Sequence, residues 1–410
     1  MKYDTIFCVL QYRTMTTPTV SVTVKAFKRL LNHDCWVFRD ELARPDPPVD
    51  DGAVVLVTDR QGHPAGQAFY SQHSHVALRF LTRDAEAPID RAFFRHRLEH
   101  AIARRSGLRG TNARRVVFSE ADGLPGLIVD QYAGVLVVQL RNAGIDRFRP
   151  VLAELLQELL SPAGILERSD KEFREDEGLP LVTQILAGAV PDRVTIEEDG
   201  LRFLVDPHHG LKTGYYLDQR PTRQRLRQWV QPDQLLLDVF SYTGSLGICA
   251  ASRGARVICV EQEERVFELA KENARMNGVA DRIEFIPADA FYWLALKQSQ
   301  GLRADWLILD PPGLAKTRGR LQQARQALHH LLVQGLGLLN DHGRLILSIC
   351  TPALLPVAEE IVRIAAADQG SRLLVRDLWT QPEDHPWVLQ IPPTRYLTSW
   401  CFERDAPPAA

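Results

Sequence analysis

Four acidic residues lie at or just past the ends of apolar runs in the C-terminal half of the chain: Asp238, Glu261, Asp289 and Asp310. A single acid after a strand is usually a loop residue or a helix cap, whereas four in succession indicate a shared site. Carboxylates accept hydrogen bonds from the hydroxyls of a ribose and from the amine of an adenine. The set therefore favours S-adenosylmethionine (SAM), which carries a ribose, an adenine and an aminoacyl arm but no phosphate.

The first of these runs leads into a turn, Phe240-Ser241-Tyr242-Thr243-Gly244, that opens a helix. We expect Gly244 to let the backbone approach a ligand at the helix N-terminus. A dinucleotide site would require the pattern Gly-x-Gly-x-x-Gly, because a pyrophosphate must lie against bare backbone. Only the Gly-x-x-Gly half, Gly244 to Gly247, is present, which disfavours an NAD-dependent dehydrogenase.

A rigid loop follows the fourth run, where Asp310 is succeeded by Pro311 and Pro312. Proline fixes φ and restricts the residue before it, so this loop cannot continue the strand and would point Asp310 at a planar nitrogenous substrate. Enzymes that methylate an exocyclic amine usually place an aromatic residue after this motif to stack on the base. Here Gly313 and Leu314 follow, so a ring carbon is the favoured target.

Cys350 supplies the group that methylation of a pyrimidine carbon needs. Carbon 5 is barely nucleophilic until a thiolate has added to carbon 6. Cys350 ends the fifth apolar run, and Thr351-Pro352 stops that run. The alternative is a buried free thiol, and this is the interpretation that we give to Cys249, Cys259 and Cys401.

A doubly wound α/β domain would position these residues. The apolar runs between residues 235 and 350 alternate with helical patterns, as strands buried on both faces of a parallel sheet do. Ligands of such sheets bind at the carboxyl ends of the strands. Before this domain, residues 20–81 have the short alternating runs of a small all-β unit, and residues 90–160 have the mixed pattern of an α+β unit.

Composition agrees with a multidomain globular enzyme. The chain has 410 residues, a 45% apolar fraction and a net charge of −2, which gives no global sign of a nucleic-acid partner. The scattered cysteines indicate a reducing, cytoplasmic compartment and no metal site. No apolar run approaches the roughly 18 residues of a membrane span. We expect residues 1–18 to be a flexible extension that lacks a signal peptide and offers an alternative start at Met15.

Several motifs, in order, resemble those of one family. The most specific is His209-Gly210-Leu211-Lys212-Thr213-Gly214-Tyr215-Tyr216-Leu217-Asp218-Gln219-Arg220. It is accompanied by Asn32-His33, Trp36-Val37-Phe38, Asp122-Gly123-Leu124-Pro125-Gly126, Arg168-Ser169-Asp170, Phe240 to Gly244, Asp310-Pro311-Pro312 and Asp384-His385-Pro386. From about residue 20 to residue 403 the chain resembles the PUA-domain-containing cytosine-C5 methyltransferases of bacterial large-subunit (23S) ribosomal RNA.

The resemblance implies a PUA RNA-binding domain at 19–87, a small β-barrel, followed by a central α+β domain at 88–195. A Rossmann-like class I methyltransferase domain would fill 196–410. Cys350 is then the nucleophile and Asp310 holds the cytosine. Ribosomal RNA would be the partner, and relatives suggest a homodimer. Cofactor binding is expected from Tyr216, Asp218, Gln219, Arg220, Asp238, Phe240, Ser241, Tyr242, Thr243, Gly244, Glu261, Asp289 and Asp310, and substrate binding from Pro311, Pro312, Lys316 and Trp36.

The chain departs from the family pattern near the base pocket. The family often has Ser-Cys-Ser around the nucleophile, where this chain has Ile349-Cys350-Thr351, and it often has phenylalanine at the place of Leu314. An Arg-Gly-Tyr-Lys segment reads Gln326 to His329 here. No second cysteine lies beside Asp310, so release of the thioether would need another base. Two alternatives stay open: a guanine methyltransferase of the same fold and a non-catalytic RNA-binding assembly factor.

Two further features could serve RNA. Between residues 91 and 115 eight arginines face a single acid, Glu99, and such a run could contact phosphates beside the PUA domain. Past the two prolines, Lys316, Arg318 and Arg320 could grip the backbone beside a splayed-out base. We also expect Asp384-His385-Pro386 to close the mouth of the site.

Overall fold

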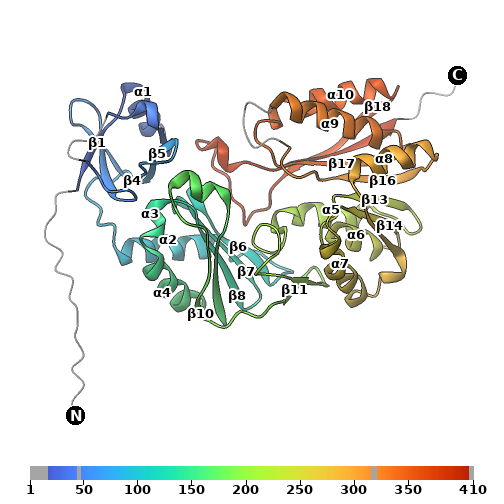
Figure 1. The fold of residues 1–410 in the computed structure, drawn as a ribbon, viewed down its shortest axis with the longest axis horizontal. Coiled ribbons are helices and arrows are strands. Elements are labelled where there is room, and N and C mark those ends of the chain that lie inside the picture. The colour runs from blue at the N-terminus through green and yellow to red at the C-terminus, as the bar shows by residue number, and fades with distance from the viewer. Residues whose placement is uncertain (1–16, 44–47, 315–320, 406–410) are drawn as a thin grey trace, which may run out of the picture.

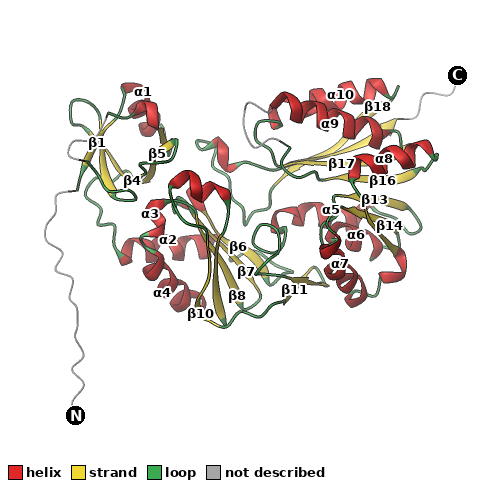
Figure 2. Ribbon diagram, in the orientation of Figure 1, coloured by secondary structure: helices red, strands yellow, loops and turns green. Residues whose placement is uncertain are grey.

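The computed structural model describes residues 17–43, 48–314 and 321–405. It contains a five-stranded N-terminal sheet, a five-stranded central sheet, a two-stranded hairpin and a seven-stranded C-terminal sheet (Figures 1 and 2). The expected N-terminal extension, with Met15, lies outside the described residues except for its last two positions. So do Lys316, Arg318 and Arg320.

The N-terminal sheet has the strand order β1-β3-β4-β5-β2. Its elements are β1 (Thr19–Ser21), α1 (Val24–Leu31), β2 (Trp36–Phe38), β3 (Val54–Thr58), β4 (Pro64–Tyr70) and β5 (Val76–Thr82), with a 3₁₀ turn η1 (Arg39–Glu41). The all-β prediction is wrong at α1. The Thr23 hydroxyl accepts a hydrogen bond from the Ala26 backbone N–H at 3.3 Å, so Thr23 caps a helix where alternation predicted a strand.

The central sheet has the order β10-β9-β8-β7-β6, and all neighbours except β8 and β9 are antiparallel. Helix α2 begins at Asp90, whose side chain accepts from the Phe93 backbone N–H at 3.0 Å, and packs with α4 against the sheet. The elements are α2 (Arg91–Arg104), β6 (Ala113–Phe118), η2 (Ser119–Asp122), β7 (Leu127–Tyr132), β8 (Val135–Leu140), α3 (Ala143–Asp146), α4 (Arg149–Leu160), β9 (Gly164–Ser169), η3 (Glu172–Glu177) and β10 (Val182–Gly188).

The arginine-rich run of α2 and β6 is largely occupied inside the protein. Arg105 binds both oxygens of Asp122 at 2.7 Å, and Arg115 binds both oxygens of Asp130 at 2.8 Å. Both arginines are buried. On the surface Arg91 and Arg95 pair with Glu158. Arg105 and Arg115 are therefore not available to phosphates, because acids from later in the chain bind them inside the protein. For the exposed Arg91 and Arg95 the expectation stays a prediction.

The C-terminal sheet has the order β15-β14-β13-β16-β17-β19-β18, with only β19 antiparallel to its neighbours. This confirms the doubly wound sheet. The predicted domain boundary between residues 195 and 196 falls within β11, which forms the two-stranded hairpin with β12. The elements are β11 (Val194–Glu198), β12 (Leu201–Val205), η4 (Leu217–Gln219), α5 (Arg220–Trp229), β13 (Leu235–Val239), α6 (Ser245–Ala251), β14 (Arg256–Glu261), α7 (Glu264–Met276), η5 (Ala280–Arg282), β15 (Ile283–Pro287), α8 (Ala290–Ser299), β16 (Ala304–Leu309), α9 (Leu321–Leu336), β17 (Leu339–Ile349), η7 (Leu355–Val357), α10 (Ala358–Asp368), β18 (Arg372–Thr380), η8 (Pro392–Thr394) and β19 (Thr398–Asp405).

Helices cover both faces of this sheet. Because strand side chains alternate in direction, Leu236 packs with α5, α6 and α7, whereas Leu237 packs with α8, α9 and α10. The first of these cores also contains Tyr132, Val135 and Val137 of the central sheet. The central sheet and the C-terminal sheet therefore share one continuous core. No described helix is long and apolar enough to cross a membrane.

Candidate active site

A cavity of about 380 Å³ lies at the carboxyl ends of the parallel strands of the C-terminal sheet. Parallel sheets place their ligand sites at this edge. We call it the strand-end cavity, and it is lined by Leu211, Lys212, Tyr216, Asp218, Gln219, Phe240, Ser241, Tyr242, Ser245, Leu246, Glu261, Asp310, Pro311, Pro312, Gly313, Cys350 and Leu397.

The turn between β13 and α6 forms one wall of the cavity in an unusual backbone conformation. Phe240 and Tyr242 have φ values of 67° and 48°, and Gly244 has 72°. Left-handed conformations are costly for residues with a Cβ, and they concentrate at functional sites. The turn is held by Phe240 and Ser241, whose backbone N–H groups donate to the Val260 carbonyl at 2.9 and 3.1 Å. Two aromatic side chains are thereby presented to the cavity.

Glu261 ends β14 with its carboxylate fixed at the cavity. One oxygen accepts the Tyr242 backbone N–H at 3.1 Å. The other accepts the backbone N–H groups of Gln262 and Glu263 at 2.8 and 3.2 Å. These bonds orient the carboxylate and leave an acceptor position on the oxygen that contacts Tyr242, because that oxygen accepts one N–H group whereas the other accepts two. This arrangement fits a ribose hydroxyl.

Asp310 and Cys350 line the same cavity from the ends of two neighbouring strands, β16 and β17. The Gln219 side-chain amide donates to Asp310 at 2.8 Å. Burial raises the pKa of Asp310 to about 7. Burial, followed by the charge of Asp310, raises the pKa of the Cys350 thiol to about 11. A carboxyl that can hold a proton at neutral pH thus lies in one cavity with a protonated thiol.

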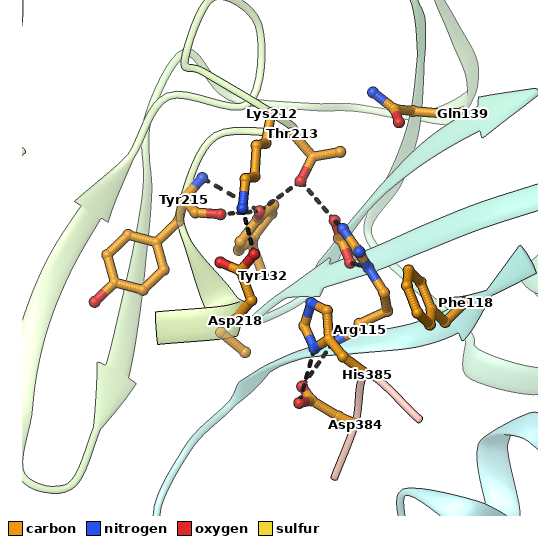
Figure 3. Close-up of polar contacts among 12 residues, drawn as sticks. Arg115, Phe118, Tyr132, Gln139, Lys212, Thr213, Tyr215, Asp218, Asp384 and His385 are labelled. Carbon is orange, nitrogen blue, oxygen red and sulfur yellow. Dashed lines mark hydrogen bonds and ion pairs between the residues drawn. The ribbon is translucent and has the colours of Figure 1, made fainter. Parts of the chain in front are cut away.

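Lys212 stands at the edge of the cavity on a segment pinned to the central sheet. Its ammonium pairs with the buried Asp218 and lies 4.3 Å from the centre of the Tyr216 ring. The neighbouring Thr213 donates to Asp130 at 2.6 Å and is 2.7 Å from the Tyr132 hydroxyl. Figure 3 shows this chain of contacts running from Lys212 toward the strands of the central sheet.

Comparisons with known proteins decide the family. Residues 20–83 match a PUA-like domain, and residues 208–342 match a family described as conserved hypothetical protein 95. Ribosomal RNA large subunit methyltransferase I of Cronobacter sakazakii is 34% identical over 380 residues, which are 90% of this chain and 95% of the relative. Its namesake from Escherichia coli O157:H7 is 32% identical over 377 residues, with the same shares. The chain belongs to the ribosomal RNA large subunit methyltransferase I family.

Solved structures agree with this family's fold. SMU.776, described as a methyltransferase and crystallised in complex with SAH, has a TM-score of 0.83 at 20% identity and covers 94% of this chain and 100% of its own. A SAM-dependent methyltransferase from Streptococcus mutans has a TM-score of 0.81 at 21% identity, with the same coverage. The predicted fold class, a class I methyltransferase domain behind a PUA-like domain, is confirmed.

In this member of the family, most residues predicted for the site lie together. Tyr216, Asp218 and Gln219 line the strand-end cavity, as do Phe240, Ser241 and Tyr242. The predictions did not include six lining residues. Leu211 and Lys212 could have been found, because they lie in the motif that carried the resemblance, whereas Ser245, Leu246, Gly313 and Leu397 have no distinctive signal.

The remaining acids lie outside the cavity. Asp238 is buried, and one of its oxygens accepts the Gly247 backbone N–H at 2.9 Å, which braces the start of α6. Burial raises the pKa of Asp238 to about 7. Asp289 is exposed and caps α8 by accepting the Tyr292 backbone N–H at 2.9 Å. Thr243 and Gly244 shape the turn without lining the cavity.

Arg220 and the Asp384-His385 pair also lie elsewhere. Arg220 is buried against Glu198 at 3.1 Å and Asp384 at 3.3 Å. Asp384 accepts the Arg115 backbone N–H at 3.0 Å, and His385 lies 3.0 Å from Asp384 (Figure 3). The expectation that this pair closes the mouth of the site is wrong. Both side chains are buried because they join the C-terminal domain to the central sheet.

Trp36 lines a second cavity. Its indole N–H donates to Glu120 of the central domain at 3.0 Å. The second cavity, which we call the interdomain cavity, has a volume of about 590 Å³ and is lined by Trp36, Arg115, Phe118, Ser119, Glu120, Gln139, Arg141, Lys171, Leu211, Lys212, Thr213, Tyr216, Pro393, Thr394 and Tyr396. Trp36 therefore lies in a space that adjoins the strand-end cavity rather than in that cavity itself.

Proposed function

We propose that the chain is a SAM-dependent methyltransferase that forms 5-methylcytidine in large-subunit (23S) ribosomal RNA. The observation that carries the proposal is the presence of Asp310, Cys350 and the oriented Glu261 carboxylate in one cavity. The names of the family's curated members support ribosomal RNA as the substrate, and the PUA-like domain supports RNA binding. The homodimer and the exact domain boundaries stay predictions.

The residues of the strand-end cavity fit SAM. Glu261 offers an acceptor for a ribose hydroxyl, and Phe240 and Tyr242 offer apolar surface for a planar ring. The cation that lines the cavity, Lys212, is already paired with Asp218, so no free positive charge there demands a phosphate. When bound, SAM supplies an electrophilic methyl group.

Cys350 would begin the reaction by adding its sulfur to carbon 6 of cytosine. The S–C6 bond forms as the thiol gives its proton to water, and electron density moves to carbon 5, which bonds to the methyl group as S-adenosylhomocysteine leaves. Asp310, with a pKa of about 7, can donate a hydrogen bond to the ring and stabilise the charge that develops there. A base then removes the proton from carbon 5 as the C6–S bond breaks, which frees Cys350.

Replacing Glu261 with alanine should weaken SAM binding about 10- to 100-fold, because a ribose hydroxyl would lose a charged acceptor. Isothermal titration with SAM measures this change. Glu263→Ala is the matched control, because Glu263 is exposed and its side chain makes no capping bond to α7. Equal SAM affinity in wild type and Glu261→Ala would show that Glu261 does not hold the ribose.

The proposed product is tested by nucleoside mass spectrometry of bacterial ribosomal RNA incubated with SAM and the wild-type protein. RNA from a strain that lacks the family's enzyme supplies unmodified sites. We expect new 5-methylcytidine. Methylguanosine would contradict the cytosine assignment and would make Cys350 a core thiol, and failure to bind SAM at all would favour a non-catalytic RNA-binding protein.

A further inference from the structure

The interdomain cavity lies where four parts of the chain meet. Its walls come from the PUA-like domain, the central domain, the Lys212 segment and the segment from Pro393 to Tyr396. It shares Leu211, Lys212 and Tyr216 with the strand-end cavity, so one thin wall separates the two spaces. When one unit of a polymer enters the strand-end cavity, the interdomain cavity therefore lies beside the neighbouring part of that polymer.

Most charged groups that line the interdomain cavity are already paired. Arg115 is held by Asp130 at 2.8 Å, and Lys171 lies 3.5 Å from Asp170. Lys212 pairs with Asp218. The carboxylate of Glu120 accepts from the Trp36 indole at 3.0 Å and from the Ser119 hydroxyl. These side chains therefore leave little net charge for a ligand.

Arg141 is the exception among the described residues of this cavity. No described carboxylate forms an ion pair with it. Its Nε and Nη2 groups donate to the same oxygen of Gln139, at 3.2 and 3.0 Å, and its guanidinium lies 4.7 Å from the centre of the Phe173 ring. Burial, followed by the charge of Arg115, lowers the pKa of Arg141 to about 10. The cation stays charged at neutral pH, and among the described residues it forms no ion pair.

Gln139 is an unusual residue in its strand. Strand β8 reads Val-Leu-Val-Val-Gln-Leu, and Val135 and Val137 of the same strand face lie in the core shared with the C-terminal domain. Gln139 continues that face and is only 3% exposed. Its amide nitrogen donates to no described residue, and no dashed line reaches its side chain in Figure 3. The nitrogen is not among the fully buried side-chain atoms that lack a partner, so it is open to the interdomain cavity that Gln139 lines.

The free polar groups at this point are therefore all donors. They are the Nη1 group of Arg141 with the remaining Nη2 hydrogen, and the amide of Gln139. A guanidinium edge matches the two oxygens of a phosphate. Most base edges carry donors as well as acceptors, so a base bound here would place one of its own donors against a donor of Arg141 or Gln139. Building on the proposed function, we propose that Arg141 and Gln139 bind a phosphate of the RNA strand next to the nucleotide that enters the strand-end cavity.

The test is equilibrium binding of a single-stranded ribosomal RNA fragment that contains the methylated position, measured at several salt concentrations. Arg141→Gln should weaken binding about 10- to 100-fold, because a charged hydrogen-bonded contact is lost. The slope of log affinity against log salt should become less negative by about 0.7, as expected for one phosphate contact on a single strand. SAM affinity should not change. Arg372→Gln is the control, because the Arg372 side chain is 77% exposed on the edge strand β18.

A second variant distinguishes loss of the phosphate contact from misfolding of Arg141→Gln. Gln139→Glu keeps the shape of the side chain and gives Arg141 a carboxylate, so it should fold and still weaken RNA binding by a similar factor. Unchanged affinity and salt slope in both variants would overturn the phosphate site. Since these measurements need no methyl transfer, they can fail or succeed independently of the product assignment, which the nucleoside analysis tests.

Discussion

Replacing Cys350 with alanine is expected to abolish methyl transfer to RNA, with a fall in rate of at least about 10⁴-fold, as when other covalent nucleophiles are removed. Without the sulfur no group adds to carbon 6, so carbon 5 of the base does not become nucleophilic. SAM affinity should stay within about 1 kcal/mol of the wild-type value. Single-turnover transfer of a labelled methyl group measures the rate, and calorimetry measures the affinity.

Cys401→Ala is the matched control for this experiment, because Cys401 is a buried free thiol on β19 outside the strand-end cavity. It should keep the wild-type rate. A second readout comes from RNA that carries 5-fluorocytidine at the target, which cannot lose a proton from carbon 5. Wild type should form a covalent complex with it and Cys350→Ala should not. A near-normal rate of methyl transfer by Cys350→Ala would contradict the thiolate mechanism.

Replacing Glu198 with alanine is expected to lower the free energy of unfolding by about 3 to 5 kcal/mol, because it removes the carboxylate that pairs with the buried Arg223 and leaves the buried Arg220 with Asp384 alone. Glu198 ends β11 and is 3% exposed. Its carboxylate binds Arg220 at 3.1 Å and Arg223 at 3.0 Å. Urea denaturation followed by tryptophan fluorescence measures the loss. Glu197→Ala, the exposed neighbour on the same strand, should change stability by less than about 0.5 kcal/mol.

This loss should depend on pH. Burial acts to raise the pKa of Glu198, but the charge of Arg223 and its hydrogen bond outweigh burial and hold the pKa below the ordinary value of 4.5. A lowered native pKa contributes stability that is present above the unfolded pKa and is lost as the pH falls through the native one. The difference between wild type and Glu198→Ala should therefore narrow below about pH 4.5. A constant difference down to pH 3 would mean that Glu198 stabilises by packing alone.

The strands and the cavity could be predicted because their signals are local. Buried parallel strands are continuous apolar runs, and their carboxyl ends must meet at one edge of the sheet. This predicted that Glu261, Asp310 and Cys350 would lie together, and they line one cavity. Asp238 and Asp289 do not line it, which could not be predicted because the sequence does not tell whether an acid at a strand end faces a cavity or an N–H group. The first braces α6 and the second caps α8.

Ion pairs between residues far apart in the chain could not be predicted from the sequence. The arginines of α2 and β6 appeared free because their partners, such as Asp122 and Asp130, are brought to them only by the fold. Asp384 and His385 appeared to belong to a loop at the site, yet they are buried against the central sheet. Arg141 gave no signal in the sequence, because its lack of an ion pair with any described carboxylate depends on the fold.

The continuous core beneath the central sheet and the methyltransferase sheet has a consequence for how substrates are selected. Tyr132, Val137 and Leu236 pack in the same interior, so neither domain can tilt against the other without opening apolar surface to water. The distance between the strand-end cavity and the interdomain cavity is then fixed. For the proposed RNA substrate, a strand is accepted only if its own bend matches that spacing, and discrimination among RNAs can rest on shape as well as on base identity.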